Sequence, residues 1–419
     1  MKRIAALTLV VVCLCCSQNA TVSAGQDATE IPALSKQQWR DDLRYFAREM
    51  QKRHMNLFHR MSREEFERSV SELEAEIPSL EAHQIVVRLQ QIAARVGDGH
   101  TGVHSPPWFR LYPLALYWFG GELRVTATTK DYKRALGARV VRIGELPIAE
   151  VEERVRSCFP SAEAENEWYA LNTSPSFITR PEVLHALGVI TDPARAPFTF
   201  EDDQGDPFVL ELKPVVMPPV AHGTVVIPGM LPVVAPPIFR QKPVERFWFT
   251  SLPDSTVYVS WRGYEKLGEQ ARSLFHFLDN HPVKRVVIDL RQNGGGDFLE
   301  GRKHMIRPLQ QRAALNQKGR LFVIVGRRTY SAALANAVDF RKDTNAILVG
   351  EPIGERPNSY SENDELTLPN SRLVVSYSTR YYKFVDEDVP AVLPDVRIDP
   401  NWPEWRAGRD PVMDWILQQ

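Results

Sequence analysis

The stretch Val286-Val-Ile-Asp-Leu-Arg-Gln-Asn-Gly-Gly-Gly296 joins an apolar run to three consecutive glycines. A short apolar run that ends in turn residues is typical of a buried strand in a parallel sheet. A second apolar run, Leu321–Val325, leads to Ser331 and an alanine-rich helical pattern. With the strand expected at 257–261 and the helix at 267–280, this alternation predicts an α/β domain, whose sites are usually built in loops at the strand ends.

Ser331 is expected at or just before the N-terminus of that helix. There the helix dipole and free backbone N–H groups stabilise negative charge, so a serine is either an N-cap or a nucleophile beside an oxyanion hole. A cap needs nothing else from the chain, whereas a nucleophile needs a base and oxyanion donors. Position alone leaves both interpretations open.

The glycines at 294–296 allow the backbone to approach a ligand closely with its N–H groups exposed. They are equally compatible with a tight turn. A P-loop is excluded because no Lys-Ser or Lys-Thr follows them, and the glycine spacing of dinucleotide sites is absent. The run therefore indicates part of an oxyanion hole or a structural turn.

Together, residues 289–296 and Thr329-Tyr-Ser-Ala-Ala333 resemble the signature of the tail-specific (C-terminal processing) serine peptidases of family S41. Further matching segments follow in the same order over most of the chain: Gly97-Asp-Gly-His-Thr101, a PDZ-like segment at 135–151, Val349-Gly-Glu-Pro352 and Val392-Leu-Pro-Asp-Val396. The resemblance implies a ClpP/crotonase-like α/β core of repeated β-β-α units, with an N-terminal helical region and a PDZ-like β-rich insert.

The same resemblance implies that peptide bonds are hydrolysed through an acyl-enzyme on Ser331. The oxyanion donors would be the N–H of Ala332 and that of Gly294 or Gly295. Each such donor stabilises a transition state by roughly 3 to 4 kcal/mol.

The general base differs from the best-known branch of this family, which uses a Lys in the turn after the nucleophile helix. Glu355 or Arg356 occupies that place here; a Glu is not an amine base, and an Arg stays protonated. A second branch, resembling the tricorn core protease, draws its base from a His after the N-terminal helices, where His100 lies. An imidazole is a suitable base at neutral pH, so the expected pair is Ser331 with His100. The alternative for His100 is a turn histidine with structural hydrogen bonds.

The acid that orients His100 is expected from a residue near the C-terminus, as in the tricorn-like branch. In the acidic run 386–388, Asp388 is the first choice, and Asp98 is a local alternative. Either carboxylate could instead be a solvated loop charge. Gly99 stands where that branch has a serine, so the relay to the base is altered here.

The composition is that of a globular chain with several domains, since 43% of its 419 residues are hydrophobic. The chain has 51 Lys and Arg residues and 52 Asp and Glu residues, which gives a net charge of -1. This balance provides no long-range electrostatic field that would attract nucleic acid or anionic lipid. The expected division is a signal peptide at 1–24, a helical region carrying the Gly-Asp-Gly-His-Thr turn at 25–112, a PDZ-like domain at 113–215, a Pro-rich linker or flap at 216–245, and a peptidase core at 246–419.

Residues 1–24 are typical of a cleaved export signal, with Lys2-Arg3, an apolar run from Ile4 to Cys16 and small residues ending at Ala24. The apolar run is too short for a stable membrane span. The mature chain is therefore expected to be periplasmic or extracellular, and lipid modification of the signal is left open. Cys158 alone would remain, which excludes an intramolecular disulfide and favours a packing role.

The leading hypothesis is an exported endopeptidase or carboxyl-terminal processing peptidase that captures peptide or protein substrates by β-augmentation on its PDZ-like part. No cofactor is expected, and no metal site, because His100 and His104 lie four apart in a glycine-rich turn. The alternative is a catalytically silent ligand- or peptide-binding module on the same fold. A crotonase-like acyl-CoA enzyme fits poorly with export. The sequence leaves the oligomeric state and the natural substrate open.

Overall fold

The computed structural model describes residues 30–217 and 227–419, so the predicted signal and residues 218–226 of the Pro-rich segment lie outside the described residues. The chain forms two compact units. The first unit comprises Met1–Ala164, Thr173–Val233 and Tyr360–Tyr381, and the second comprises Glu165–Asn172, Val234–Ser359 and Tyr382–Gln419. Both units are discontinuous, whereas the sequence-based division is contiguous and stays a prediction.

A six-stranded sheet forms the centre of the second unit. Its neighbouring strands are parallel except for the antiparallel pair β9 and β10. The predicted strands appear as β10, β11 and β12, and this α/β sheet, together with the β-rich insert of the first unit, confirms the predicted fold class. The strand order is β16 (Val396–Arg397), β13 (Ile347–Gly350), β12 (Leu321–Val325), β11 (Arg285–Asp289), β10 (Thr256–Trp261) and β9 (Phe247–Ser251).

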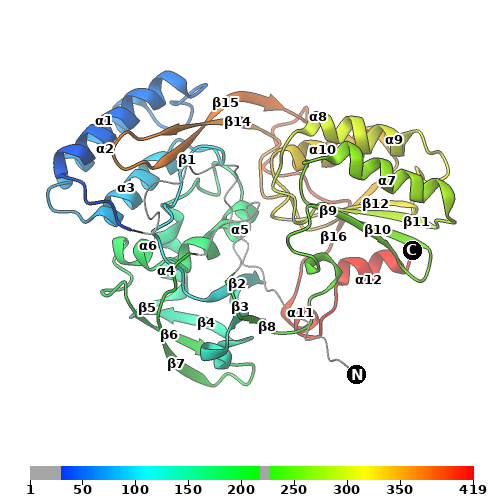
Figure 1. The fold of residues 1–419 in the computed structure, drawn as a ribbon, viewed down its shortest axis with the longest axis horizontal. Helices are drawn as coiled ribbons and strands as arrows, with labels where there is room; N and C mark the ends of the chain where they lie inside the picture. The colour runs from blue at the N-terminus through cyan, green and yellow to red at the C-terminus, as the bar shows by residue number, and fades with distance from the viewer. Residues whose placement is uncertain (1–29, 218–226) are drawn as a thin grey trace. The chain divides into compact units, whose positions relative to one another are not determined.

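Two long helices, α7 (Leu267–Asn280) and α10 (Ala332–Asp343), lie on one face of this sheet (Figure 1). Alternate strand residues point toward them, so Val259, Ile288 and Val323 share one hydrophobic core with the apolar stripes of both helices. Every residue of β10, β11 and β12 is buried, which is why these strands are mostly apolar and lack a strict alternation of apolar and polar residues.

The opposite face of the sheet is covered by α12 (Pro411–Leu417), whose Trp415 meets Phe322 edge-on with ring centroids 6.2 Å apart. Shorter elements complete this unit: η2 (Ile238–Arg240), α8 (Phe298–Gly301), the π-helical η3 (Arg302–Ile306), α9 (Arg307–Gln310) and α11 (Trp402–Arg406). In Figure 1, α12 lies below the strands of this sheet.

The first unit begins with three helices, α1 (Lys36–Arg53), α2 (Arg63–Glu76) and α3 (Ala82–Ala94). A capping box begins α2, because Ser62 Oγ accepts the Glu65 N–H and the Glu65 carboxylate accepts the Ser62 N–H. Phe46 and Phe66 of α1 and α2 are buried, with ring centroids 6.3 Å apart.

A β-rich insert with a seven-stranded sheet follows these helices. A turn at Gly120-Gly121 joins its first two strands, with φ 54° and 89° at the two glycines. A hairpin around Gln204-Gly205 joins β6 to β7. The elements of the β-rich insert are β2 (Leu114–Phe119), β3 (Glu122–Thr129), η1 (Lys130–Ala135), β4 (Arg139–Ile143), β5 (Leu146–Pro147), α4 (Ile148–Arg156), α6 (Pro181–Ala186), β6 (Ala196–Glu201), β7 (Pro207–Leu212) and β8 (Met230–Pro232). Helix α5 (Glu167–Ile178) contains the boundary between the two units.

A small three-stranded sheet completes the first unit with strands from the far end of the sequence. It has the order β1 (Gly102–Val103), β15 (Val374–Lys383) and β14 (Asn358–Thr367). Gly102 pairs with Ser376 and Val103 with Val375. The turn that carries His100 is thus fixed by a hairpin whose two ends belong to the second unit.

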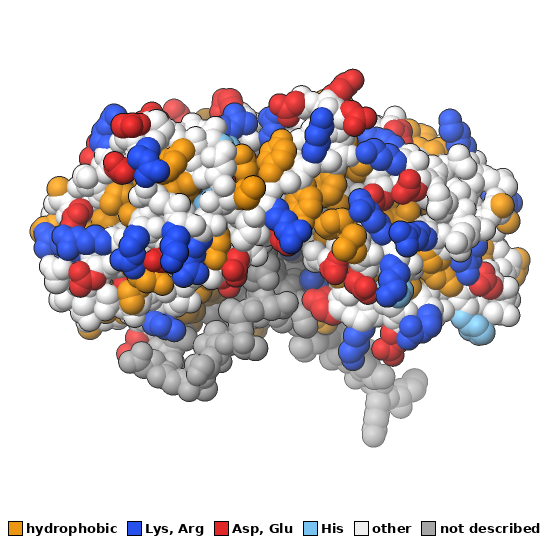
Figure 2. All heavy atoms as spheres, turned by 90° about the horizontal axis from the view of Figure 1, so that it is seen from above, with side chains coloured by type: hydrophobic (Ala, Val, Ile, Leu, Met, Phe, Trp, Pro, Cys, Tyr) orange, Lys and Arg blue, Asp and Glu red, His pale blue; other side chains and the backbone are white. Residues whose placement is uncertain are grey.

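The surface mixes both signs of charge. Figure 2 shows Lys and Arg side chains interspersed with Asp and Glu on the face in view, as the net charge of -1 leads one to expect. Over residues 30–217 and 227–419, no helix is long and apolar enough to cross a membrane.

Candidate active site

Ser331 lies in a strained turn between β12 and α10. Its backbone has φ 55° and ψ -122°, a region that favours glycine and costs a side-chain-bearing residue about 1 to 3 kcal/mol. Its side chain makes no capping hydrogen bond to α10. The capping alternative therefore does not describe this serine, and its hydroxyl is not used to satisfy the helix.

Hydrogen bonds to the loop after β11 hold this turn in place. Thr329 Oγ1 donates to the carbonyl oxygen of Leu290 at 2.9 Å, and the Gly326 N–H donates to Thr329 Oγ1 at 3.1 Å. The Tyr330 N–H donates to the carbonyl oxygen of Asn293 at 3.0 Å. Such ties to neighbouring segments allow a residue in a sparsely populated conformation to persist.

The glycine run packs directly against the serine. Gly295 has φ 112°, and a Cβ built on it would lie 2.7 Å from Ser331 Cβ and 3.2 Å from its Oγ. On Gly296, with φ 151°, a Cβ would lie 2.4 Å from Tyr264 Cδ2. The fold thus brings the two sequence motifs together, and the close approach requires glycine.

The backbone N–H groups around the serine differ in availability. The Gly295 N–H donates to Asn293 Oδ1 at 3.0 Å. Neither the Gly294 N–H nor the Ala332 N–H has a hydrogen-bond partner within the part of the chain that the structure describes. A Cβ on Gly294 would meet no atom within 4 Å, so open space adjoins it. The geometry thus favours Gly294 over Gly295 as a donor to a ligand.

An ion-pair network fixes the start of the glycine loop. Arg291 Nη2 lies 2.7 Å from a carboxylate oxygen of Asp289 and 2.7 Å from one of Asp410. The Tyr258 hydroxyl donates to Asp289 Oδ2 at 2.7 Å. Buried and multiply bonded charges of this kind hold one geometry, so the end of β11 is a rigid support for the loop.

Glu355 has a contact with the serine that sequence reasoning missed. Its carboxylate Oε2 accepts a hydrogen bond from the Ser331 N–H across 24 positions of sequence, and the residue is only 3% exposed. Burial, together with the nearby charge of Glu165, raises the pKa of Glu355 well above its ordinary value. The sequence signal was its place where the Lys of the best-known branch is expected.

His100 lies in the first unit, in the turn between α3 and β1, and is 7% exposed. Its N–H donates to Asp98 Oδ1 at 3.2 Å, and its ring Nε2 lies 3.2 Å from Ser361 Oγ of β14. Burial lowers the pKa of His100 to about 4, although the charge of Asp98 acts in the opposite direction. The imidazole is therefore neutral at pH 7.

Asp98 is the centre of a buried polar cluster around that turn. His54 Nε2 lies 3.0 Å from Asp98 Oδ2, and Ser378 Oγ donates to Oδ1 at 2.7 Å. The Asn56 N–H donates to His54 Nδ1, so the ring proton of His54 is on Nε2 and points to Asp98. Burial acts to raise the pKa of Asp98, but these donors hold it below its ordinary value. His54 lies 44 positions from Asp98, and no local pattern pointed to it.

Asp388 belongs to the second unit. Its side chain is 75% exposed, and it lies 3.1 Å from Arg356 Nη2 in a surface ion pair. Ser331 and His100 belong to different units, so their pairing and the orienting role of Asp388 stay predictions.

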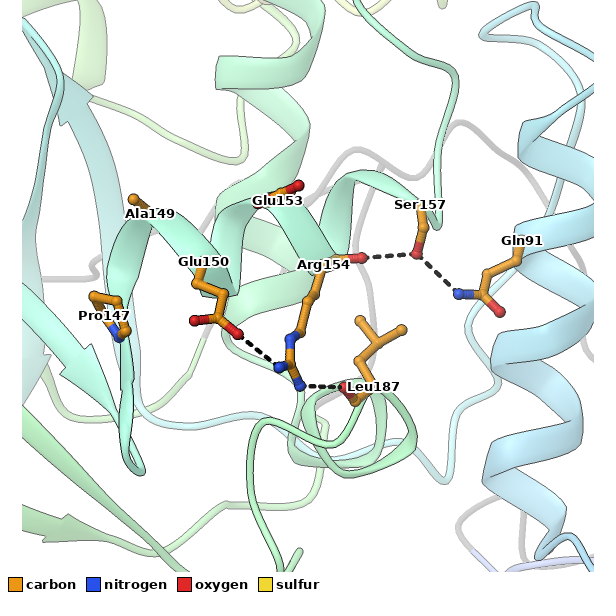
Figure 3. A pocket seen from close by; sticks show the side chains of 8 residues that line it. All are labelled: Gln91, Pro147, Ala149, Glu150, Glu153, Arg154, Ser157 and Leu187. Atoms are coloured by element: carbon orange, nitrogen blue, oxygen red, sulfur yellow. Dashed lines mark hydrogen bonds and ion pairs between the residues drawn. The ribbon is translucent and has the colours of Figure 1, made fainter.

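A hollow in the first unit is lined by Gln91, Pro147, Ala149, Glu150, Glu153, Arg154, Ser157 and Leu187 (Figure 3). Several of its polar groups bond one another. Arg154 Nη2 lies 2.6 Å from Glu150 Oε1, and Gln91 Nε2 donates to Ser157 Oγ at 2.9 Å. The adjacent thiol of Cys158 is buried, which raises its pKa to about 12 and leaves it without nucleophilic character. This hollow therefore lacks the features of a reactive centre.

No protein-family model and no curated protein matches the chain. Among solved structures, mature CPAF complexed with lactacystin matches with a TM-score of 0.59 at 10% identity, covering 91% of this chain and 97% of that chain. Lower scores link the chain to the photosystem II D1 C-terminal processing protease (TM-score 0.42, 13% identity, 86% and 93% covered) and to tricorn protease (0.41, 13%, 91% and 36%). The match to CPAF establishes a shared fold over nearly the whole chain.

Proposed function

We propose that this chain is an exported serine peptidase that hydrolyses peptide bonds through an acyl-enzyme on Ser331. The observation that carries the proposal is the strained turn of Ser331, packed on a glycine loop with its hydroxyl unused by the helix. A strained strand-to-helix turn is the device by which hydrolases expose a nucleophilic oxygen beside backbone N–H donors.

In the proposed mechanism, the neutral imidazole of His100 takes the proton of Ser331 Oγ as the oxygen attacks the substrate carbonyl. The carbonyl oxygen becomes negative and is stabilised by the N–H groups of Ala332 and Gly294. The C–N bond then breaks, and the leaving amine receives the proton from His100. A water molecule, deprotonated by the same imidazole, attacks the ester and releases the second product together with the free serine.

The pairing of Ser331 with His100 is proposed from sequence position, since His100 stands where the tricorn-like branch has its base. Glu355 binds the Ser331 N–H, and Ser361, which contacts His100, follows it closely in sequence.

For the orienting acid, Asp388 was the first choice from sequence and Asp98 the alternative. The contacts within the first unit favour Asp98, since its carboxylate already binds the turn of His100. Asp388 is engaged with Arg356 at the surface. The β-rich insert is proposed to capture an extended peptide segment by strand addition, the PDZ-like role.

Covalent labelling with a fluorophosphonate probe tests this function. We expect rapid labelling of folded wild-type protein and none of Ser331→Ala or of heat-denatured protein. Labelling of Ser331→Ala at the wild-type rate would show that another residue is the nucleophile. Absence of labelling in folded wild type would favour the silent binding module.

A further inference from the structure

A pair of buried carboxyl groups lies under the nucleophile turn in the second unit. Glu355 is 3% exposed and Glu165 is 1% exposed. Two hydrogen bonds join the segments that carry them: the side-chain Nδ2 of Asn166 donates to the Ile353 carbonyl oxygen at 3.1 Å, and the Arg356 N–H donates to Glu165 Oε2 at 3.2 Å. The two side chains are thus fixed parts of the fold.

The loop that carries Glu355 packs closely on the turn before Ser331. A Cβ built on Gly354 would lie 2.0 Å from the carbonyl oxygen of Arg327, so the two backbones touch. This approach brings the Glu355 carboxyl to the Ser331 N–H. That N–H is the group whose direction is set by the unusual φ of the serine.

We propose that Glu355 is a positioning residue for the nucleophile, because its buried carboxyl accepts the Ser331 N–H and thereby holds the positive-φ turn that presents Oγ. The inference rests on the proposed function of Ser331. In this arrangement the Ser331 N–H donates to Glu355, and the neighbouring Ala332 N–H is available to donate to the oxyanion. It also gives a role to the position where the Lys of the related peptidases would lie.

The charge state of Glu355 matters for the same geometry. An ionised carboxylate on the Ser331 N–H would repel the oxyanion that forms beside it, whereas the uncharged acid would not. Other charged groups lie on the segments that pack around Glu355. Arg327 pairs with Glu351, Arg356 pairs with Asp388, and Arg328 Nη1 has no hydrogen-bond partner among the described residues. The negative charge of Glu165 acts on Glu355 itself. Because burial and Glu165 raise the pKa of Glu355, the uncharged form persists to higher pH, and activity is expected to fall as the pH rises through that pKa.

The test compares Glu355→Gln, whose amide oxygen can still accept the N–H, with Glu355→Ala, which cannot. Two readouts are measured: the rate of fluorophosphonate labelling across pH 5 to 10, and the hydrogen exchange of the Ser331 amide. We expect Glu355→Ala to label about tenfold more slowly and its Ser331 amide to exchange about tenfold faster, the factor set by one ordinary hydrogen bond. Glu355→Gln should keep both values near wild type and lose the fall at high pH.

Glu165→Gln is a second test variant. It removes a negative charge that raises the pKa of Glu355, so the fall in labelling rate at high pH should begin at a lower pH. The matched control is Glu300→Gln, whose side chain in the same unit is 41% exposed and which should behave as wild type. If Glu355→Ala proves unstable, the test is the labelling rate of Glu355→Gln at high pH. This rate should stay constant where the wild-type rate falls.

The inference would be overturned if Glu355→Ala kept the wild-type rates of labelling and of Ser331 amide exchange. It would also be overturned if Glu355→Ala and Glu355→Gln changed both rates equally. If wild-type protein is not labelled but Ser331 exchange responds as expected, the contact stands and the proposed peptidase function falls. The amide readout thus separates the two failures.

Discussion

Replacing Gly295 with Ala is the sharpest test of the packing beneath the nucleophile. The new Cβ would lie 2.7 Å from Ser331 Cβ, while ordinary contacts begin at about 3.4 Å, so the serine or the loop must move by about 0.7 Å. The φ of 112° adds backbone strain of about 1 to 3 kcal/mol, and overpacking adds a cost of similar size. A misplacement approaching 1 Å costs up to about a hundredfold in rate, so labelling of Ser331 should slow between tenfold and a hundredfold.

Gly319→Ala is the matched control, because it adds the same methyl group to a glycine of the same unit that lies outside the proposed site. Its φ of 78° is positive like that of Gly295, but its Cβ would meet nothing within 4 Å. The assay is the second-order rate of fluorophosphonate labelling, with thermal unfolding measured for each variant. We expect the labelling rate of Gly319→Ala to stay within about threefold of wild type, because its backbone strain lowers stability without moving an atom of the nucleophile turn. Wild-type labelling of Gly295→Ala, or equal losses in both variants, would refute the packing argument.

Three further predictions concern the base and its acid. His100→Ala should reduce labelling of Ser331 at least about a hundredfold, the usual contribution of a general base, and full retention would mean that the base is another residue. The labelling rate of wild type should fall on acidification only near pH 4, because burial lowers the pKa of His100 and the neutral imidazole is the active form; a midpoint near 6.5 would contradict this. Asp98→Asn removes a charge that raises the pKa of His100, so the acid limb of the labelling profile should move to still lower pH while the labelling rate drops. Asp388→Asn should change the labelling rate less than about fivefold, because an exposed ion pair contributes at most about 1 kcal/mol.

Much of the second unit could be predicted from sequence because its central strands are buried on both faces. Such strands are rich in apolar residues, so β10, β11 and β12 were predicted to within a residue or two. Helix α7 was equally clear, since its apolar residues recur at helical spacing on one face. These features depend on local pattern alone.

The details of the site depend on contacts between distant segments, which no local pattern encodes. The positive φ of Ser331 is imposed by its neighbours' bonds to Leu290 and Asn293. The approach of Glu355 depends on how its loop packs on Arg327, and His54 reaches Asp98 only through the fold of the first unit. Sequence position could identify the serine but not its conformation or its buried partners.

The origin of β14 and β15 late in the chain has a consequence for the order in which the protein is made. Ser361 and Ser378, which contact His100 and Asp98, are synthesised after the whole parallel sheet except β16. Domains generally fold from the N-terminus as the chain leaves the ribosome. The first unit cannot complete the surroundings of its histidine until residue 381 has emerged, so a nascent chain carries the serine long before the environment of its proposed base exists. Ribosome-bound chains ending near residue 350 would accordingly contain Ser331 and lack activity.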